Sequence, residues 1–279
     1  MQASARIRSG DEADFPAVET IAGPLESGVL LVCDHASNAL PPMYGDLGLP
    51  AGARERHIAY DIGAAEVTRR LAAKLRAPAV LSTYSRLLID PNRGADDPTL
   101  VMRYSDGAVV PGNARVDAAE IASRLALYWK PYRDAVTAMA EAMIAAGAPP
   151  AFVSIHSFTP VWRGAARPWK VGALWDVDDR LARPLLDALA AEPDLGAEAV
   201  GDNEPYDGAL KGDTIDASAT ARGLTNVLIE IRQDLIADPA GAEAWAARLA
   251  RLLGPILADP AVREARNMGT RVEGRRGRR

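Results

Sequence analysis

Four short motifs place chemically reactive side chains directly after apolar segments of this chain. The motifs are Cys33-Asp34-His35, Asp90-Pro91-Asn92-Arg93, Ser154-Ile155-His156-Ser157 and Glu230-Ile231-Arg232. Short apolar segments of this kind form buried strands, and open α/β sheets bind ligands outside the carboxyl ends of their strands. Two of the three histidines of the chain lie in these motifs. Two histidines, a carboxylate and an Asn-Arg pair together predict a metal-dependent hydrolase acting on a carboxylate-bearing substrate.

The first candidates for metal ligands are His35 and His156. Either histidine alone is as readily explained as a hydrogen-bonded residue at the start of a loop, but two such strand ends favour a metal site. A catalytic zinc ion usually has three protein ligands, often two histidines and one carboxylate. Candidates for the third ligand are Asp61, Asn38 and His57. We prefer Asp61, because a carboxylate binds zinc better than an amide, and His57 would then line the pocket or orient Asp61.

Glu230 lies within an otherwise apolar segment, Leu228-Ile229-Glu230-Ile231-Arg232. An unpaired charge in a buried strand is costly, so this carboxylate needs a reason to be there. One interpretation is a structural ion pair with Arg232, two residues along the same strand face. The preferred interpretation is a general base that takes a proton from the attacking water.

Further residues are expected to bind the substrate or stabilise its transition state. An arginine fork grips a carboxylate in bidentate fashion, so Asn92 and Arg93 are candidate substrate-binding residues. An arginine is expected to stabilise the oxyanion, and either Arg163 or Arg232 could serve. Tyr206 is expected in a loop that closes over the pocket. A Cys33-His35 nucleophile pair is less favoured than a small, buried Cys33 in the core.

The spacing of apolar residues predicts an α/β fold, because short apolar runs alternate with longer helical patterns. Three stretches between these elements are predicted to be loops near the site: 92–116, 159–170 and 201–223. Pro131 is expected to kink the second helix or to lie at a break in it. The predicted strands are 29–33, 79–82, 86–90, 151–155, 171–175 and 226–231, and the predicted helices are 58–76, 117–146, 178–192 and 240–257.

Composition limits the class of protein. The 279 residues carry a net charge of −5, and the Arg-rich segment 263–279 contributes +5, so the remainder is near −10. Such an acidic body argues against nucleic-acid binding. A single cysteine excludes a disulfide framework and fits a reducing compartment. With no signal sequence and no transmembrane segment recognised, we expect a cytoplasmic protein that does not bind membranes.

The motifs, taken in order, resemble the N-formylglutamate amidohydrolase family. The resemblance spans about residues 30 to 236, and its individually short motifs are fairly specific in this order. The stretches that carry it are Cys33-Asp34-His35-Ala36-Ser37-Asn38-Ala39-Leu40-Pro41, His57-Ile58-Ala59-Tyr60-Asp61-Ile62-Gly63-Ala64, Ser85-Arg86-Leu87-Leu88-Ile89-Asp90-Pro91-Asn92-Arg93, Ser154-Ile155-His156-Ser157-Phe158, Gly201-Asp202-Asn203-Glu204-Pro205-Tyr206 and Leu228-Ile229-Glu230-Ile231-Arg232-Gln233-Asp234-Leu235.

This resemblance implies a three-layer α/β/α fold with a mostly parallel, mixed sheet, similar to zinc carboxypeptidases and other zinc exopeptidases and hydrolases. It also implies one zinc ion per chain, with Glu230 as base. The Asp-Pro-Asn-Arg motif is similar to the Asp-Leu-Asn-Arg motif of acyl-aspartate hydrolases, in which it holds the substrate carboxylate. One departure is Asn38, which stands where the carboxypeptidase pattern has a glutamate ligand.

We therefore expect a zinc-dependent amidohydrolase acting on a small-molecule N-acyl amino acid, with N-formyl-L-glutamate as the first candidate. Two alternatives are a peptidoglycan amidase and a non-catalytic binding protein on the same fold. The expected organisation is one α/β domain over residues 1–262, with an N-terminal arm to about residue 27, and a disordered basic tail over 263–279. The sequence leaves the oligomeric state open.

Overall fold

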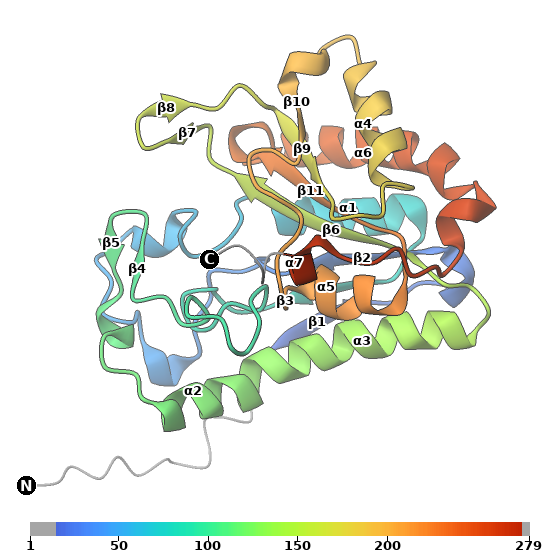
Figure 1. Ribbon diagram of the computed structural model, residues 1–279. Coiled ribbons are helices and arrows are strands. Elements are labelled where there is room, and N and C mark those ends of the chain that lie inside the picture. Colours follow the sequence, from blue (N-terminus) through green and yellow to red (C-terminus); the bar gives the residue numbers. More distant parts are fainter. Residues whose placement is uncertain (1–14, 275–279) are drawn as a thin grey trace, which may run out of the picture.

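A seven-stranded mixed sheet forms the centre of the protein in the computed structural model, which describes residues 15–274 (Figure 1). The strand order is β1-β3-β2-β6-β11-β9-β10. Four central strands run parallel to one another, whereas β1 is antiparallel to β3 and β9 is antiparallel to β11. The strands are β1 (Val18–Ile21), β2 (Val29–Cys33), β3 (Ala79–Ser82), β6 (Ala151–Phe158), β9 (Val171–Leu174), β10 (Val200–Asp202) and β11 (Asn226–Arg232).

Helices cover both faces of this sheet, giving the expected three layers (Figure 1). On one face α1 (Ala64–Leu75), α4 (Ala182–Ala190) and α6 (Pro239–Leu257) pack against the strands, and on the other lies α3 (Lys130–Ala145). The shorter helices are α2 (Ala118–Arg124), α5 (Thr214–Ser218) and α7 (Arg271–Gly274). Two small hairpins, β4 (Tyr104–Ser105) with β5 (Ala108–Val109) and β7 (Val161–Trp162) with β8 (Ala165–Ala166), extend from the sheet.

The alternation of side chains along the central strands builds two hydrophobic cores. In β2, Leu31 packs toward α1, α4 and α6, whereas Leu30 and Val32 pack toward α3. Because both faces are covered, the strand is apolar throughout rather than alternating. In β6, Val153 and Ile155 face the first core, so Ser154 and His156 point to the opposite face.

Most predicted elements are confirmed, but the predicted loops are not free of regular structure and one predicted strand is absent. The predicted loops 92–116 and 159–170 contain the β4–β5 and β7–β8 hairpins, and the predicted loop 201–223 contains α5. The predicted strand 86–90 is wrong: Leu87, Leu88 and Ile89 are buried in the core, but they lie in a turn and in the irregular segment that follows it. Their backbone is satisfied locally, since the Leu88 N–H donates to the Ser85 carbonyl and the Asp90 N–H to the Leu100 carbonyl. The short apolar run therefore predicted the burial of these residues correctly but their backbone conformation incorrectly.

Several boundaries also differ from those expected. The first helix begins at Ala64 rather than at residue 58, after Gly63, whose φ is +81°. A Cβ on Gly63 would lie 2.1 Å from the Ile236 carbonyl oxygen, so only glycine fits at this position. The second predicted helix contains a π-helical turn, Leu125–Trp129, shortly before Pro131, in agreement with a break near this proline.

The described parts of the predicted N-terminal arm and C-terminal tail contribute more to the fold than expected. Residues 18–21 of the predicted N-terminal arm form β1, while the part of the arm before residue 15 lies outside the described residues. Residues 263–274 of the predicted disordered tail are described, and Arg271 donates hydrogen bonds to the Asp176 carboxylate. Residues 275–279 of that tail lie outside the described residues. None of the helices in the described range 15–274 is long and apolar enough to cross a membrane.

Candidate active site

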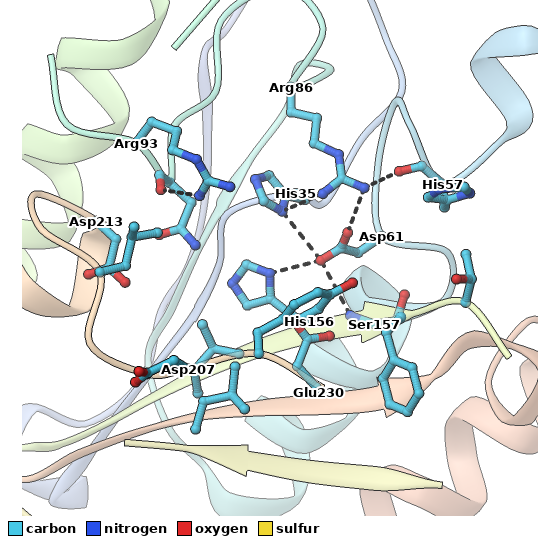
Figure 2. A pocket seen from close by; sticks show the side chains of 18 of the residues that line it. His35, His57, Asp61, Arg86, Arg93, His156, Ser157, Asp207, Asp213 and Glu230 are labelled. Carbon is cyan, nitrogen blue, oxygen red and sulfur yellow. Dashed lines mark hydrogen bonds and ion pairs between the residues drawn. The ribbon is translucent and has the colours of Figure 1, made fainter. Parts of the chain in front are cut away.

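His35, Asp61 and His156 form one buried cluster, although they come from three different segments (Figure 2). His35 follows β2, Asp61 lies in the turn before α1, and His156 lies in β6. Oδ2 of Asp61 is 2.8 Å from Nδ1 of His156 and 3.4 Å from Nδ1 of His35. One potential ligand atom from each residue lies within 4.8 Å of the others. Of the three candidates for the third ligand, the structure brings Asp61 to the histidines.

The remaining imidazole nitrogens are held by two further buried carboxylates. Nε2 of His35 is 2.7 Å from Oδ1 of Asp90, and Nε2 of His156 is 3.0 Å from Oδ2 of Asp34. A carboxylate that accepts the N–H of one ring nitrogen fixes the tautomer, leaving the other nitrogen free to bind a metal. Both Nδ1 atoms therefore face Asp61 as a pair, and the donor set fits a zinc ion bound by two histidines and a carboxylate.

The pKa shifts of His156 and Asp61 also favour a cation in this cluster. Burial lowers the pKa of His156, but its hydrogen bonds to Asp34 and Asp61 outweigh burial and raise that pKa well above the usual value. Burial raises the pKa of Asp61, but Arg86 and the two histidines hold it well below the usual range. The cluster thus attracts positive charge to the space between its Nδ1 and Oδ2 atoms, where a divalent cation would replace the ring protons.

Glu230 lies beside His156, with which it is in register across the parallel strands β11 and β6. Its Oε2 atom is buried and has no hydrogen-bond partner among the described residues. Burial raises the pKa of Glu230 to about 7, against the opposing effect of His156. The alternative interpretation, an ion pair with Arg232, is not supported, since the Arg232 Nε donates to Asp234 at 2.8 Å instead. An unpartnered carboxylate with a pKa near neutrality is suited to act as a general base.

Arg86 also lies at this site, although the sequence did not predict it as a site residue. Its guanidinium lies 3.2 Å from Oδ1 of Asp61 and 3.3 Å from Nδ1 of His35, and it also donates to the carbonyls of Ile58 and His57. Arg86 is the first residue of the predicted strand 86–90, and no sequence feature distinguished it from a surface arginine. It is the arginine that lines the cavity beside the metal-ligand cluster.

The two arginines expected to stabilise an oxyanion are placed elsewhere. Arg163 lies in the turn of the β7–β8 hairpin, with φ +50°, and its guanidinium lies over the Trp162 ring. Arg232 lies at the end of β11, paired with Asp234. Neither residue lines the cavity. The arginine that lies beside the metal-ligand cluster is Arg86.

A cavity of about 420 Å³ opens over the cluster. The four predicted substrate-binding residues all line it: Asn92, Arg93, His57 and Tyr206. The amide oxygen of Asn92 accepts from the Thr214 N–H at 3.0 Å, and the Arg93 guanidinium donates to the Asn92 carbonyl at 3.0 Å. The Tyr206 hydroxyl accepts from Arg167 at 3.1 Å.

Among the described residues, the other candidates for the third ligand are not part of this cluster. The Asn38 side chain donates to the Arg54 carbonyl at 3.0 Å. Nε2 of His57 is 3.4 Å from a carboxylate oxygen of Asp106. Burial, followed by the charge of Arg86, lowers the pKa of His57. His57 and Asp61 do not share a helix face as expected, because both precede the first residue of α1.

Cys33 is a core residue, as expected. It is fully buried in the core that packs against α1, and burial raises the pKa of its thiol well above the usual value. A thiol in this state is a poor nucleophile.

Comparison with known proteins places this chain in a family. The profile of the N-formylglutamate amidohydrolase family matches residues 27–237. The solved structure of gene product Atu2144 from Agrobacterium tumefaciens is 37% identical, with a TM-score of 0.81, over 91% of this chain and 98% of that chain. N-formylglutamate amidohydrolase from Ralstonia eutropha JMP134 shares the fold at 18% identity, with a TM-score of 0.67, over 86% of this chain and 97% of that chain. No curated protein matches the chain. This chain belongs to the N-formylglutamate amidohydrolase family.

Proposed function

We propose that this protein is a zinc-dependent hydrolase that cleaves the amide bond of an N-acyl amino acid. The observation that carries the proposal is a buried His35-Asp61-His156 cluster that shares its cavity with the unpartnered carboxylate of Glu230. The family supplies N-formyl-L-glutamate as the first substrate to test, with formate and L-glutamate as products.

The metal site would be formed by Nδ1 of His35, Nδ1 of His156 and one carboxylate oxygen of Asp61. A zinc ion bound there lowers the pKa of a water molecule and polarises the acyl carbonyl. Asp90 and Asp34 hold the imidazole rings through their Nε2 atoms, which fixes the direction of both Nδ1 lone pairs.

Glu230 would move the proton in this reaction. Its free Oε2 takes the proton from water as the oxygen adds to the acyl carbon. The same carboxyl then gives that proton to the amide nitrogen as the C–N bond breaks, so that the products are a carboxylic acid and an amine. A pKa near 7 suits both halves of this transfer.

Arg86 and the Asn92-Arg93 pair would hold the two ends of the reacting group. The Arg86 guanidinium, fixed by Asp61 and by backbone carbonyls, stabilises negative charge that develops on the acyl oxygen. Arg93 lines the cavity, and its Nε and Nη1 atoms are held by Thr99 and by the Asn92 carbonyl. A substrate carboxylate would bind this positioned guanidinium. Asn92 is held in place by the Thr214 N–H.

The experiment is a comparison of the zinc-loaded enzyme with its Glu230→Gln variant. Amine release from N-formyl-L-glutamate and other N-formyl amino acids is measured together with zinc content. Loss of a general base lowers kcat by about 10²- to 10⁴-fold, while the variant retains zinc. A Glu230→Gln variant with wild-type activity would refute the assignment of the base. A zinc-free wild-type protein, purified with zinc present, would favour a binding protein instead.

A further inference from the structure

We propose that the substrate's amino-acid side chain occupies an apolar subsite formed by Leu174, Ala209, Leu210 and Leu228. The enzyme then prefers N-acyl amino acids with an apolar side chain to N-acyl glutamate. This inference rests on the proposed function and specifies its substrate class. All four residues line the cavity that contains the metal-ligand cluster and Glu230.

The position of this apolar surface follows from two contacts. Leu228 is two residues before Glu230 on the same face of β11, and it is in register with Leu174 of β9. The segment that carries Ala209 and Leu210 continues to Thr214, whose N–H binds the amide oxygen of Asn92. The apolar surface therefore adjoins both the base and the proposed carboxylate anchor. A substrate held between them directs the side chain of its α-carbon at this surface.

The loop that completes the subsite is fixed in place. A Cβ on Gly208 would lie 2.2 Å from the Trp175 nitrogen, so the loop packs directly on the end of β9. The Asn203 amide oxygen accepts from the N–H groups of both Trp175 and Gly208, at 2.9 and 3.0 Å. The subsite is thus preformed, and a ligand does not have to order it.

The polar groups around the subsite are acidic and offer no favourable contact to a second substrate carboxylate. Asp207 and Asp213 line the cavity on either side of Ala209 and Leu210. Asp207 is paired with Arg271, and the buried Asp213 carboxylate accepts from the Asp216 N–H at 2.7 Å. A glutamate side chain placed here would lose hydration beside two carboxyl groups and would gain no cationic partner in return.

Nearby cations are not available to such a carboxylate. Arg86 and Arg93 are the arginines that line the cavity, and no lysine of the described chain lines it. Arg86 is paired with Asp61, and Arg93 is assigned to the α-carboxylate. Arg167 is buried against the rings of Phe158, Trp162 and Tyr206 and does not line the cavity.

The test is a comparison of kcat/KM for N-formyl-L-leucine, N-formyl-L-glutamine and N-formyl-L-glutamate with the zinc-loaded full-length enzyme. Glutamine matches glutamate in size and lacks its charge, so this substrate separates charge from shape. An apolar subsite discriminates by about 10-fold or more per group, so we expect leucine to exceed glutamine and glutamate to be the poorest. A kcat/KM for glutamate equal to or above that for leucine would overturn this inference and leave the proposed function standing. Hydrolysis of none of the three would overturn both.

A variant tests the location of the subsite. Leu210 is only partly buried, and Leu210→Arg introduces a cation there. We expect this variant to raise the glutamate-to-leucine ratio of kcat/KM by about 10-fold, which is the effect of one charge-assisted hydrogen bond. The matched control, Leu210→Gln, removes the apolar side chain without adding charge and is expected to leave the glutamate-to-glutamine ratio unchanged. An unaltered ratio in the arginine variant, with a wild-type circular dichroism spectrum, would place the subsite elsewhere and overturn the assignment.

Discussion

Thr214 donates its side-chain hydroxyl to Oδ1 of Asp34, although 180 residues separate the two in the chain. The other oxygen of Asp34 accepts from Nε2 of His156, and the backbone N–H of Thr214 binds Asn92. One buried carboxylate and one threonine therefore connect the proposed metal site with the proposed substrate anchor. Because Tyr132 and Ser154 also donate to Asp34, its orientation is fixed from four directions.

Replacing Asp34 with asparagine should weaken metal binding. The change removes the charge that holds the Nε2 proton of His156, so Nδ1 becomes a poorer and less well-oriented ligand. Loss of such an outer partner typically lowers metal affinity by about 10- to 100-fold. Competition with a chelator measures the zinc affinity. The control is Ser154→Ala, which removes one hydrogen bond to the same oxygen but keeps the charge, and which should have the smaller effect. Equal zinc affinity in wild type and Asp34→Asn would show that Asp34 does not support the ligand.

The acid side of the pH–activity profile should report Glu230. A general base works only when ionised, so kcat/KM should rise with pH through the pKa of this residue. Burial raises that pKa to about 7 from an ordinary value of 4.5, and a bound cation lowers it again. The inflection is therefore expected between pH 4.5 and 7. A profile that is flat over this interval, or that falls as the pH rises, is incompatible with Glu230 as the base.

Asp213 should make the protein less stable as the pH rises from about 4 to about 7. Burial raises the pKa of Asp213 to about 7 from 3.8, against the hydrogen bond from the Asp216 N–H. Between these values the folded state binds more protons than the unfolded state, so the free energy of unfolding falls as the pH increases. Above the folded pKa the loss is complete.

The Asp213→Asn variant tests this assignment. Asparagine retains the helix-capping acceptor and does not ionise. Its stability relative to wild type should therefore increase by more than about 1 kcal/mol between pH 4 and pH 7. Urea unfolding at several pH values gives the difference. A constant difference across this range would mean that the carboxyl group of Asp213 titrates normally.

Arg271 should help to hold the loop that forms one wall of the cavity. Its guanidinium lies 2.8 Å from Oδ1 of Asp207 and 3.0 Å from Oδ1 of Asp176. Without these contacts the loop gains freedom that substrate binding must then remove, so Arg271→Ala should raise KM several-fold and change kcat little. A matched control is Arg266→Ala, a change in the same C-terminal segment at a residue that does not line this cavity. Unchanged KM in Arg271→Ala would show that the C-terminal segment does not position the loop.

The sequence carried more information about the strand-borne residues than about those in turns. His156 and Glu230 could be found because the first directly follows an apolar segment and the second interrupts one, where a polar residue is expensive. Arg86 could not be found in this way. The apolar residues that follow it, Leu87, Leu88 and Ile89, are buried without forming a strand, and an apolar run predicts burial but not backbone conformation. Asp61 was selected for its chemistry, while the helix face expected to position it does not exist at that point.

The most direct test of this account is the zinc content of the purified full-length protein and of its His156→Ala variant, measured by elemental analysis after dialysis against zinc-containing buffer and removal of free metal. The account predicts about one zinc ion per wild-type chain and a large loss of zinc in a variant that retains its circular dichroism spectrum. The same zinc content in both proteins, or no zinc in the wild type, would contradict the assignment of His35, Asp61 and His156 as a metal site.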